Sequence, residues 1–263
     1  MKLGVILSYL EALAPQALQE SYDNSGLIFG SPETEVSKVL VCLDVDQKVM
    51  NVAVEQDCHL VISHHPAIFK AIRSFTEDTR EGELLVKAAR NDIALFSAHT
   101  NFDSAAGGLT DLLCSRIGLQ HVKILKEAKG READCGFGRY GSIMPMSGEQ
   151  FIKAIKTALS LDVVRCVGDI PERISRVAVY NGSYDREILD ELRVIKPHAF
   201  ITGDLKYHDA QELLENGIFT LDGGHYGTEK LFVEEMAKLL EAGLTGLTIL
   251  RYEGKDIFTY AIE

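Results

Sequence analysis

The chain has no tryptophan, only six prolines, and five cysteines that are scattered and nowhere spaced as CxxC. An odd number of scattered cysteines argues against a disulfide framework and indicates reduced thiols. No apolar stretch approaches membrane-spanning length, and the apolar start LGVIL (3–7) lacks an evident signal-peptide cleavage site. We therefore expect a cytoplasmic protein that makes no contact with a membrane.

Basic residues are also scarce: 27 Lys and Arg stand against 39 Asp and Glu, which gives a net charge of −12. Such a surface repels a phosphate backbone and disfavours nucleic acid as a partner. It still allows an anionic small molecule to bind, because bound divalent cations reverse the local field. The sequence lacks a P-loop and a GxSxG motif. It therefore predicts neither a P-loop nucleotide site nor the serine nucleophile of an α/β-hydrolase.

Short apolar segments alternate with helical patterns along most of the chain. In the first part, the expected strands are 38–44, 59–63 and 93–97, and the expected helices are 4–14, 47–56, 80–90 and 104–117. In the second part, the expected strands are 137–144, 163–167, 176–182, 199–203, 218–224 and 248–252, and the expected helices are 148–159, 184–194, 206–215 and 225–241. This alternation is typical of an α/β protein with a mostly parallel sheet covered on both faces.

The second part repeats the order of elements of the first. VLVCLD corresponds to VAVYNG, LVISHHP to FITGDLK, and ALFSAHTNFD to FTLDGGHYGTE. We therefore expect an internal duplication, with an N-terminal α/β half over 1–125, a C-terminal α/β half over 126–263 and no inserted domain. Ligands of open α/β sheets collect beyond the carboxyl ends of the strands, so a site shared by the halves would gather side chains from both.

Two adjacent histidines, His64 and His65, follow an apolar strand in the segment HLVISHHPAIFK. Neighbouring side chains of an extended chain point to opposite sides, so one ion can hardly use both rings, whereas two ions could take one ring each. Pro66 favours an extended conformation at His65 and helps to fix its direction. The alternative is a pair of polar loop residues that merely end a strand.

Two further segments end an apolar strand with residues that can bind metal. HTNFD offers His99 and Asp103, and GGHYGTE offers His225 and Glu229, which lie about one turn apart at the start of the expected helix. Each segment also has a structural alternative. Asp103 could cap the helix expected from 104, and His225 and Glu229 could form an ordinary intrahelical pair.

The candidate metal ligands from these segments are three imidazoles and two carboxylates. They are His64, His65, Asp103, His225 and Glu229. Five such ligands, with coordination positions left open, suit two divalent ions per chain better than one. Since the set has no thiolate, zinc is our first choice, and manganese, iron and nickel also fit. His99 is expected to hydrogen-bond a ligand or to move protons.

The segment GDLKYHDA occupies in the second half the place that SHHPAIFK holds in the first. Asp204 and Lys206 are candidates for binding a substrate, and His208 is a candidate for moving protons. Asp204 could instead cap the helix that follows it. YDNSGL resembles a locally hydrogen-bonded turn, and the glycine loop NGSYD is too short to predict a phosphate site.

Five segments together resemble the Nif-three-like family, whose members are often described as GTP cyclohydrolase one type two homologues. The segments are SYDNSGL, SHHPAIFK, HTNFD, TGDLKYHDA and DGGHYGTE. The resemblance implies two related α/β halves that face each other across a cleft with two metal ions, the five ligands given above, and a toroidal homohexamer. The chain departs from many relatives in having Tyr22 where they have tryptophan, and it is too short for the inserted domain of the longer members.

Two classes of function fit these observations. The first is a metal-dependent hydrolase that acts on a nucleotide-like or small heterocyclic substrate, of which a GTP cyclohydrolase-type reaction is one version. The second is a non-enzymatic protein that binds, delivers or stores metal, or serves as a scaffold. The same ligands would serve both, because coordination alone does not imply catalysis.

Overall fold

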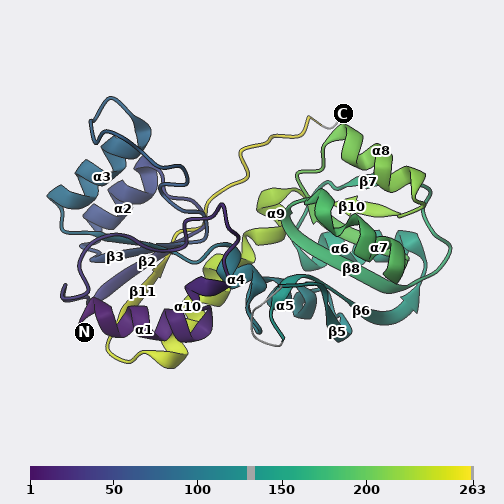
Figure 1. Cartoon of the computed structure of the whole chain (residues 1–263), viewed down its shortest axis with the longest axis horizontal. Coiled ribbons are helices and arrows are strands. Elements are labelled where there is room, and N and C mark those ends of the chain that lie inside the picture. Colours follow the sequence, from purple (N-terminus) through teal and green to yellow (C-terminus); the bar gives the residue numbers. More distant parts are fainter. Residues whose placement is uncertain (129–133, 262–263) are drawn as a thin grey trace. The chain divides into compact units, whose positions relative to one another are not determined.

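The computed structural model describes residues 1–128 and 134–261, and the chain divides into two compact units (Figure 1). The first unit comprises Met1–Ala105 and Lys230–Gly254, and the second comprises Ala106–Glu229 and Lys255–Glu263. Each unit contains its own β-sheet with helices packed against it. The α/β class expected from the sequence is therefore confirmed.

The first unit is built on a five-stranded sheet. Across the sheet, the strands are β1 (Gly26–Phe29), β4 (Ala94–Ser97), β3 (Leu60–Ser63), β2 (Lys38–Cys42) and β11 (Thr248–Arg251). All neighbours are parallel except β1, which pairs antiparallel with β4 at the edge. β3 and β4 are buried along their whole length, as parallel strands are when both faces of the sheet are covered.

The helices of this unit are α1 (Leu3–Leu13), the short η1 (Gln16–Leu18), α2 (Gln47–Glu55), α3 (Arg80–Arg90), α4 (Thr100–Ser104) and α10 (Leu231–Gly243). α2 and α3 cover one face of the sheet, and α1 and α10 cover the other (Figure 1). On one face, Met50 of α2 and Leu84 of α3 pack in one core with Leu40 of β2. On the other face, α1 and α10 lie together, and the Tyr9 hydroxyl donates a hydrogen bond of 2.7 Å to the Leu239 carbonyl.

The chain returns to the first unit through α10 and β11. α10 buries Phe232, Met236 and Leu240, and β11 extends the sheet by pairing with β2. The sequence predicts a boundary at 125, with all later residues in a C-terminal half. The structure differs because the partner of the last strand is in the first sheet, which the strand's own residues do not reveal.

The second unit is built on a six-stranded sheet. Across it, the strands are β5 (Gln120–Glu127), β6 (Gly136–Met146), β8 (Ile174–Ser183), β9 (Ala199–Gly203), β10 (Thr220–Asp222) and β7 (Arg165–Val167). Its helices are α5 (Leu109–Arg116), α6 (Gly148–Ala158), η2 (Arg186–Ile188), α7 (Leu189–Ile195), α8 (Tyr207–Glu215) and α9 (His225–Glu229). Only β8, β9 and β10 run parallel, so this sheet is mixed rather than mostly parallel.

Each unit contains the same three-strand core. β2, β3 and β4 in the first unit, and β8, β9 and β10 in the second, are consecutive parallel neighbours in the order of the chain. In both units the third strand has an antiparallel neighbour on its outer side and is followed by a helix of five residues. This order matches the correspondence of segments from which the duplication was predicted.

Two expected helices differ from those in the structure. The helix expected over 104–117 is shortened to α5, because α4 ends at Ser104 and the turn that follows contains Gly107, whose φ of +70° lies in the left-handed region. The helix expected over 225–241 is divided into α9 and α10 at Lys230. The strands β1 and β5 were not predicted. Among the described residues, no helix combines the length and apolar character needed to cross a bilayer.

Candidate metal centre

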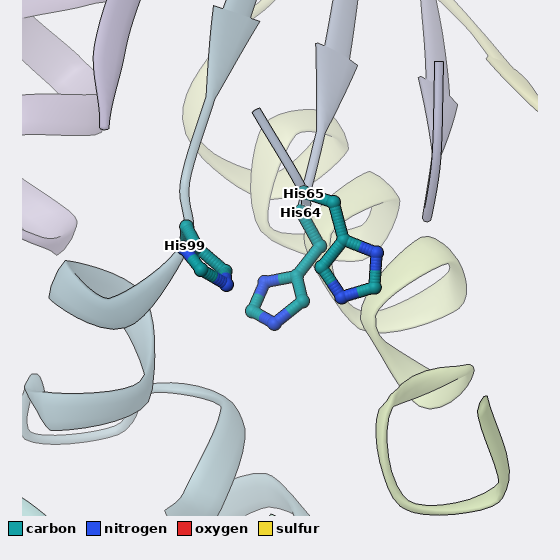
Figure 2. Close-up of side chains that lie close together, drawn as sticks. All are labelled: His64, His65 and His99. Atoms are coloured by element: carbon teal, nitrogen blue, oxygen red, sulfur yellow. The ribbon is translucent and has the colours of Figure 1, made fainter. Parts of the chain in front are cut away.

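Three histidines of the first unit lie close together at one edge of its sheet (Figure 2). His64 and His65 directly follow β3, and His99 follows β4, the parallel neighbour of β3. One ring nitrogen from each lies within 4.8 Å of the others. The centroids of the His64 ring and the other two rings are 5.1 and 5.2 Å apart. Parallel strands thus gather these side chains at their carboxyl ends.

The Nδ1 atoms of His64 and His65 each face an oxygen. His64 Nδ1 lies 2.8 Å from the Ala98 carbonyl, and His65 Nδ1 lies 2.7 Å from Asp44 Oδ1. A carbonyl oxygen or an ionised carboxylate only accepts, so Nδ1 carries the proton and a neutral ring keeps its lone pair on Nε2. This is the tautomer in which histidine binds a metal through Nε2 with an oxygen orienting the other nitrogen.

His99 is oriented in the same way by Asp23. Its Nδ1 lies 2.7 Å from Asp23 Oδ1, and the Thr100 amide and hydroxyl also donate to this carboxylate. Burial raises the pKa of Asp23, but the hydrogen bonds from His99, Thr100 and Ser25 outweigh it, so the pKa falls well below its usual range. Asp23 is therefore ionised, and His99 belongs to the three-histidine group by position, although the sequence analysis gave it only a supporting role.

Asp103 lies within α4 and faces the same group. Its Oδ1 is 3.7 Å from His64 Nε2, and its side chain is 14% exposed. The N-cap residue of α4 is His99, so the alternative in which Asp103 caps a helix is wrong. The reason is that the helix begins four residues earlier than the sequence suggested and ends one residue after Asp103.

In the second unit, His225 and Glu229 are the first and last residues of α9. His225 Nδ1 lies 2.9 Å from Asp204 Oδ2, which leaves the lone pair of a neutral ring on Nε2. That atom lies 3.0 Å from Glu229 Oε2. A lone pair facing a carboxylate at this distance requires a proton or a cation beside both. Two ligand atoms that each lie about 2 Å from one ion are themselves roughly 3 Å apart, so this pair fits a metal.

The carboxyl end of β8 provides room for Glu229. Gly182 has a φ of +66°, and a Cβ at this position would collide with Glu229 Oε1. Asn181 Nδ2 lies 3.5 Å from the same oxygen. The segment NGS therefore supports a buried carboxylate, a role that the sequence analysis did not foresee when it set the segment aside as a phosphate loop.

The three remaining candidates lie at the start of α8. Asp204 orients His225, and its φ of +47° is in the left-handed region. The N-cap residue of α8 is Lys206, so the capping alternative for Asp204 is wrong. Lys206 and His208 are exposed, and the ring of His208 contacts that of Tyr207 with centroids 5.5 Å apart.

Comparison with known proteins identifies the family of the chain. The family profile described as Duf34/NIF3 (NGG1p interacting factor 3) matches residues 1–255. The chain belongs to the DUF34/NIF3 family. A Clostridium perfringens protein named GTP cyclohydrolase 1 type 2 homolog is 32% identical over 263 residues, covering 99% of this chain and all of that protein. A Streptococcus pneumoniae protein of the same name is 34% identical over 244 residues, covering 91% and 90% of the two chains.

Solved structures of the family share this fold. A hypothetical protein from Staphylococcus aureus aligns with a TM-score of 0.90 at 26% identity, covering 99% of each chain. A Bacillus cereus protein related to NIF3 gives the same TM-score and the same coverage at 22% identity. These matches extend over both units, and the family predicted from the sequence is confirmed.

Proposed function

We propose that the protein binds two divalent ions through five ligands. These ligands are His64, His65, Asp103, His225 and Glu229. The observation that carries the proposal is that an oxygen holds Nδ1 of each of these histidines, which makes Nε2 the ligand atom. In each unit one such Nε2 also faces a carboxylate. Zinc remains our first choice, with manganese, iron and nickel as the other ions that suit imidazole and carboxylate.

The activity that this site supports best is hydrolysis of a nucleotide-like or small heterocyclic substrate. Divalent ions supply Lewis acidity, which polarises the bond under attack and makes water more acidic. His99, held by Asp23, is placed to move a proton at its Nε2. Lys206 and His208 are exposed at the start of α8, where a cation can bind an anionic group and an imidazole can exchange protons with solvent. Asp204 acts by orienting His225 rather than by binding substrate.

The names of the relatives suggest one version of this activity. The Clostridium and Streptococcus proteins are named as homologues of a GTP cyclohydrolase. Ring opening of a guanine nucleotide is thus one candidate reaction, beside phosphoester or amide hydrolysis. We further propose a cytoplasmic protein, since its cysteines are free thiols, and a toroidal homohexamer, as the family resemblance implies.

The test compares the metal-loaded wild type with Glu229→Gln on a panel of nucleotides, phosphoesters and cyclic amides. We expect turnover in the wild type that disappears with a chelator and falls at least a hundredfold in the variant. Glu149→Gln, a substitution in the first turn of α6, is the control and should retain full activity. Metal binding without turnover of any compound would favour the alternative, a protein that delivers or stores metal.

A further inference from the structure

Two aromatic side chains of the first unit are exposed beside the three histidines. Tyr22 is 64% exposed and Phe69 is 44% exposed, yet their ring centroids are only 6.3 Å apart. Phe69 in turn contacts His99, with centroids 6.1 Å apart and an interplanar angle of 83°. A solvent-exposed aromatic surface therefore lies next to His99, in contact with the three-histidine group.

Hydrogen bonds hold the backbone beside both rings. Asp23, next to Tyr22, accepts hydrogen bonds from His99 and Thr100. Asn24 Nδ2 donates a hydrogen bond of 2.7 Å to the carbonyl of Ile68, the residue before Phe69. The same short segment thus fixes His99 and joins the two loops that carry the aromatic rings. A surface held in place before binding loses less entropy when a ligand arrives.

The geometry of the two rings decides how a ligand can use them. A flat ring between two parallel rings needs centroids roughly 7 Å apart, because stacked carbon atoms are separated by about 3.5 Å. Tyr22 and Phe69 are closer than that and are tilted by 57°. They form a corner rather than a sandwich, so a planar ring stacked on one of them presents its edge to the other. Stacked and edge-to-face contacts are the two arrangements that aromatic rings prefer.

We propose that Tyr22 and Phe69 bind the planar nitrogen heteroaromatic ring of the substrate, such as a nucleobase, and place its polar edge toward His99. This proposal rests on the proposed hydrolase function, whose substrate class it narrows. The faces of tyrosine and phenylalanine rings are electron-rich, so they favour an electron-poor nitrogen heterocycle over a sugar. The net charge of −12 also makes a ring contact more useful than attraction of an anion by the protein surface.

The test measures the affinity of guanosine, adenosine, cytidine and free ribose for the full-length metal-loaded protein by NMR titration. Stacking on one aromatic side chain typically contributes about 1–3 kcal/mol, or roughly 5- to 150-fold in affinity. We expect Tyr22→Leu and Phe69→Leu each to weaken nucleoside binding about tenfold, and Tyr22→Phe to leave it unchanged. Phe75→Leu is the matched control, because Phe75 is also 64% exposed in the first unit, and it should bind like the wild type.

Three results would overturn the proposal. The first is an equal affinity of the leucine variants and the wild type for nucleosides. The second is binding of ribose as tight as that of nucleosides. The third is a change in sedimentation of Tyr22→Leu at unchanged nucleoside affinity, which would make the corner a contact between subunits. Metal content and turnover are recorded for the same samples. A wild-type protein with neither bound metal nor turnover would refute the proposed hydrolase. Wild-type turnover, together with leucine variants whose nucleoside affinity is unchanged, would refute only the aromatic corner.

Discussion

The hydrogen bond between His65 and Asp44 predicts how metal affinity depends on a residue that is not a ligand. Asp44 Oδ1 lies 2.7 Å from His65 Nδ1 and fixes the tautomer and direction of the ring. Removing such an orienting carboxylate typically costs 10- to 100-fold in metal affinity. The Asp44 side chain is 62% exposed, and water screens its charge, so we expect Asp44→Ala to lie at the lower end, about tenfold or about 1.4 kcal/mol.

Asp44→Asn should show an intermediate effect. The amide oxygen can still accept from His65 Nδ1 but lacks the negative charge, and a hydrogen bond to a charged group is roughly twice as strong as a neutral one. We therefore expect a loss of about threefold. The assay is zinc affinity measured by competition with a chromophoric chelator. Asp57→Asn, in a side chain that is 89% exposed, is the control. An affinity of Asp44→Ala within twofold of the wild type, in a folded protein, would refute the orienting role.

Three further predictions concern the second unit and the thiols. Gly182→Ala should lower the free energy of unfolding by about 2 kcal/mol, because an alanine in the left-handed region costs about 1–2 kcal/mol. It should also lower metal affinity, because the new Cβ displaces the Glu229 carboxylate on α9. Unchanged thermal melting and unchanged competition with a chelator would contradict this. Asp111→Ala should lower the free energy of unfolding in urea by about 3 kcal/mol, because Arg139 is only 2% exposed and its Nε donates a hydrogen bond of 2.6 Å to Asp111. Adding Arg139→Met should recover part of this loss, because it removes the buried charge. A double variant no more stable than Asp111→Ala would contradict this reasoning. A thiol reagent at pH 8 should modify one cysteine rapidly, since Cys166 is exposed and the others are buried. Burial also raises the pKa of Cys114 to about 12, which keeps this thiol protonated. Rapid labelling of several thiols in the folded protein would be inconsistent with this fold.

Most of the elements could be predicted from the sequence because they are locally encoded. Strands β2, β3 and β4 are short runs of apolar residues buried on both faces, which gives a strong sequence pattern. The strand β1 has a mixed burial pattern and β5 is largely exposed, so neither shows a clear periodicity. The sheet to which β11 belongs depends on a long-range pairing, and that is why the boundary of the units could not be placed correctly.

The candidate ligands were visible in the sequence, but the residues that orient them were not. His64, His65 and His99 could be grouped because parallel strands end at the same edge of a sheet. Asp23 and Asp44 lie 76 and 21 residues from the histidines that they contact. Both read as ordinary polar residues of a loop, and nothing in their spacing indicates a partner. The local hydrogen bonds predicted for YDNSGL are present, since the Asn24 amide and the Ser25 hydroxyl donate to Asp23. Only the folded chain shows that Asp23 also holds His99.

The most direct test of the account is the metal content of the purified protein, measured by elemental analysis as equivalents per chain. We expect about two equivalents in the wild type and fewer in both His65→Ala and Glu229→Ala. His121→Asn, a substitution at an exposed histidine of β5, should retain the wild-type content. A wild-type protein that holds no metal, and takes up none when zinc, manganese, iron or nickel is supplied, would contradict the central claim.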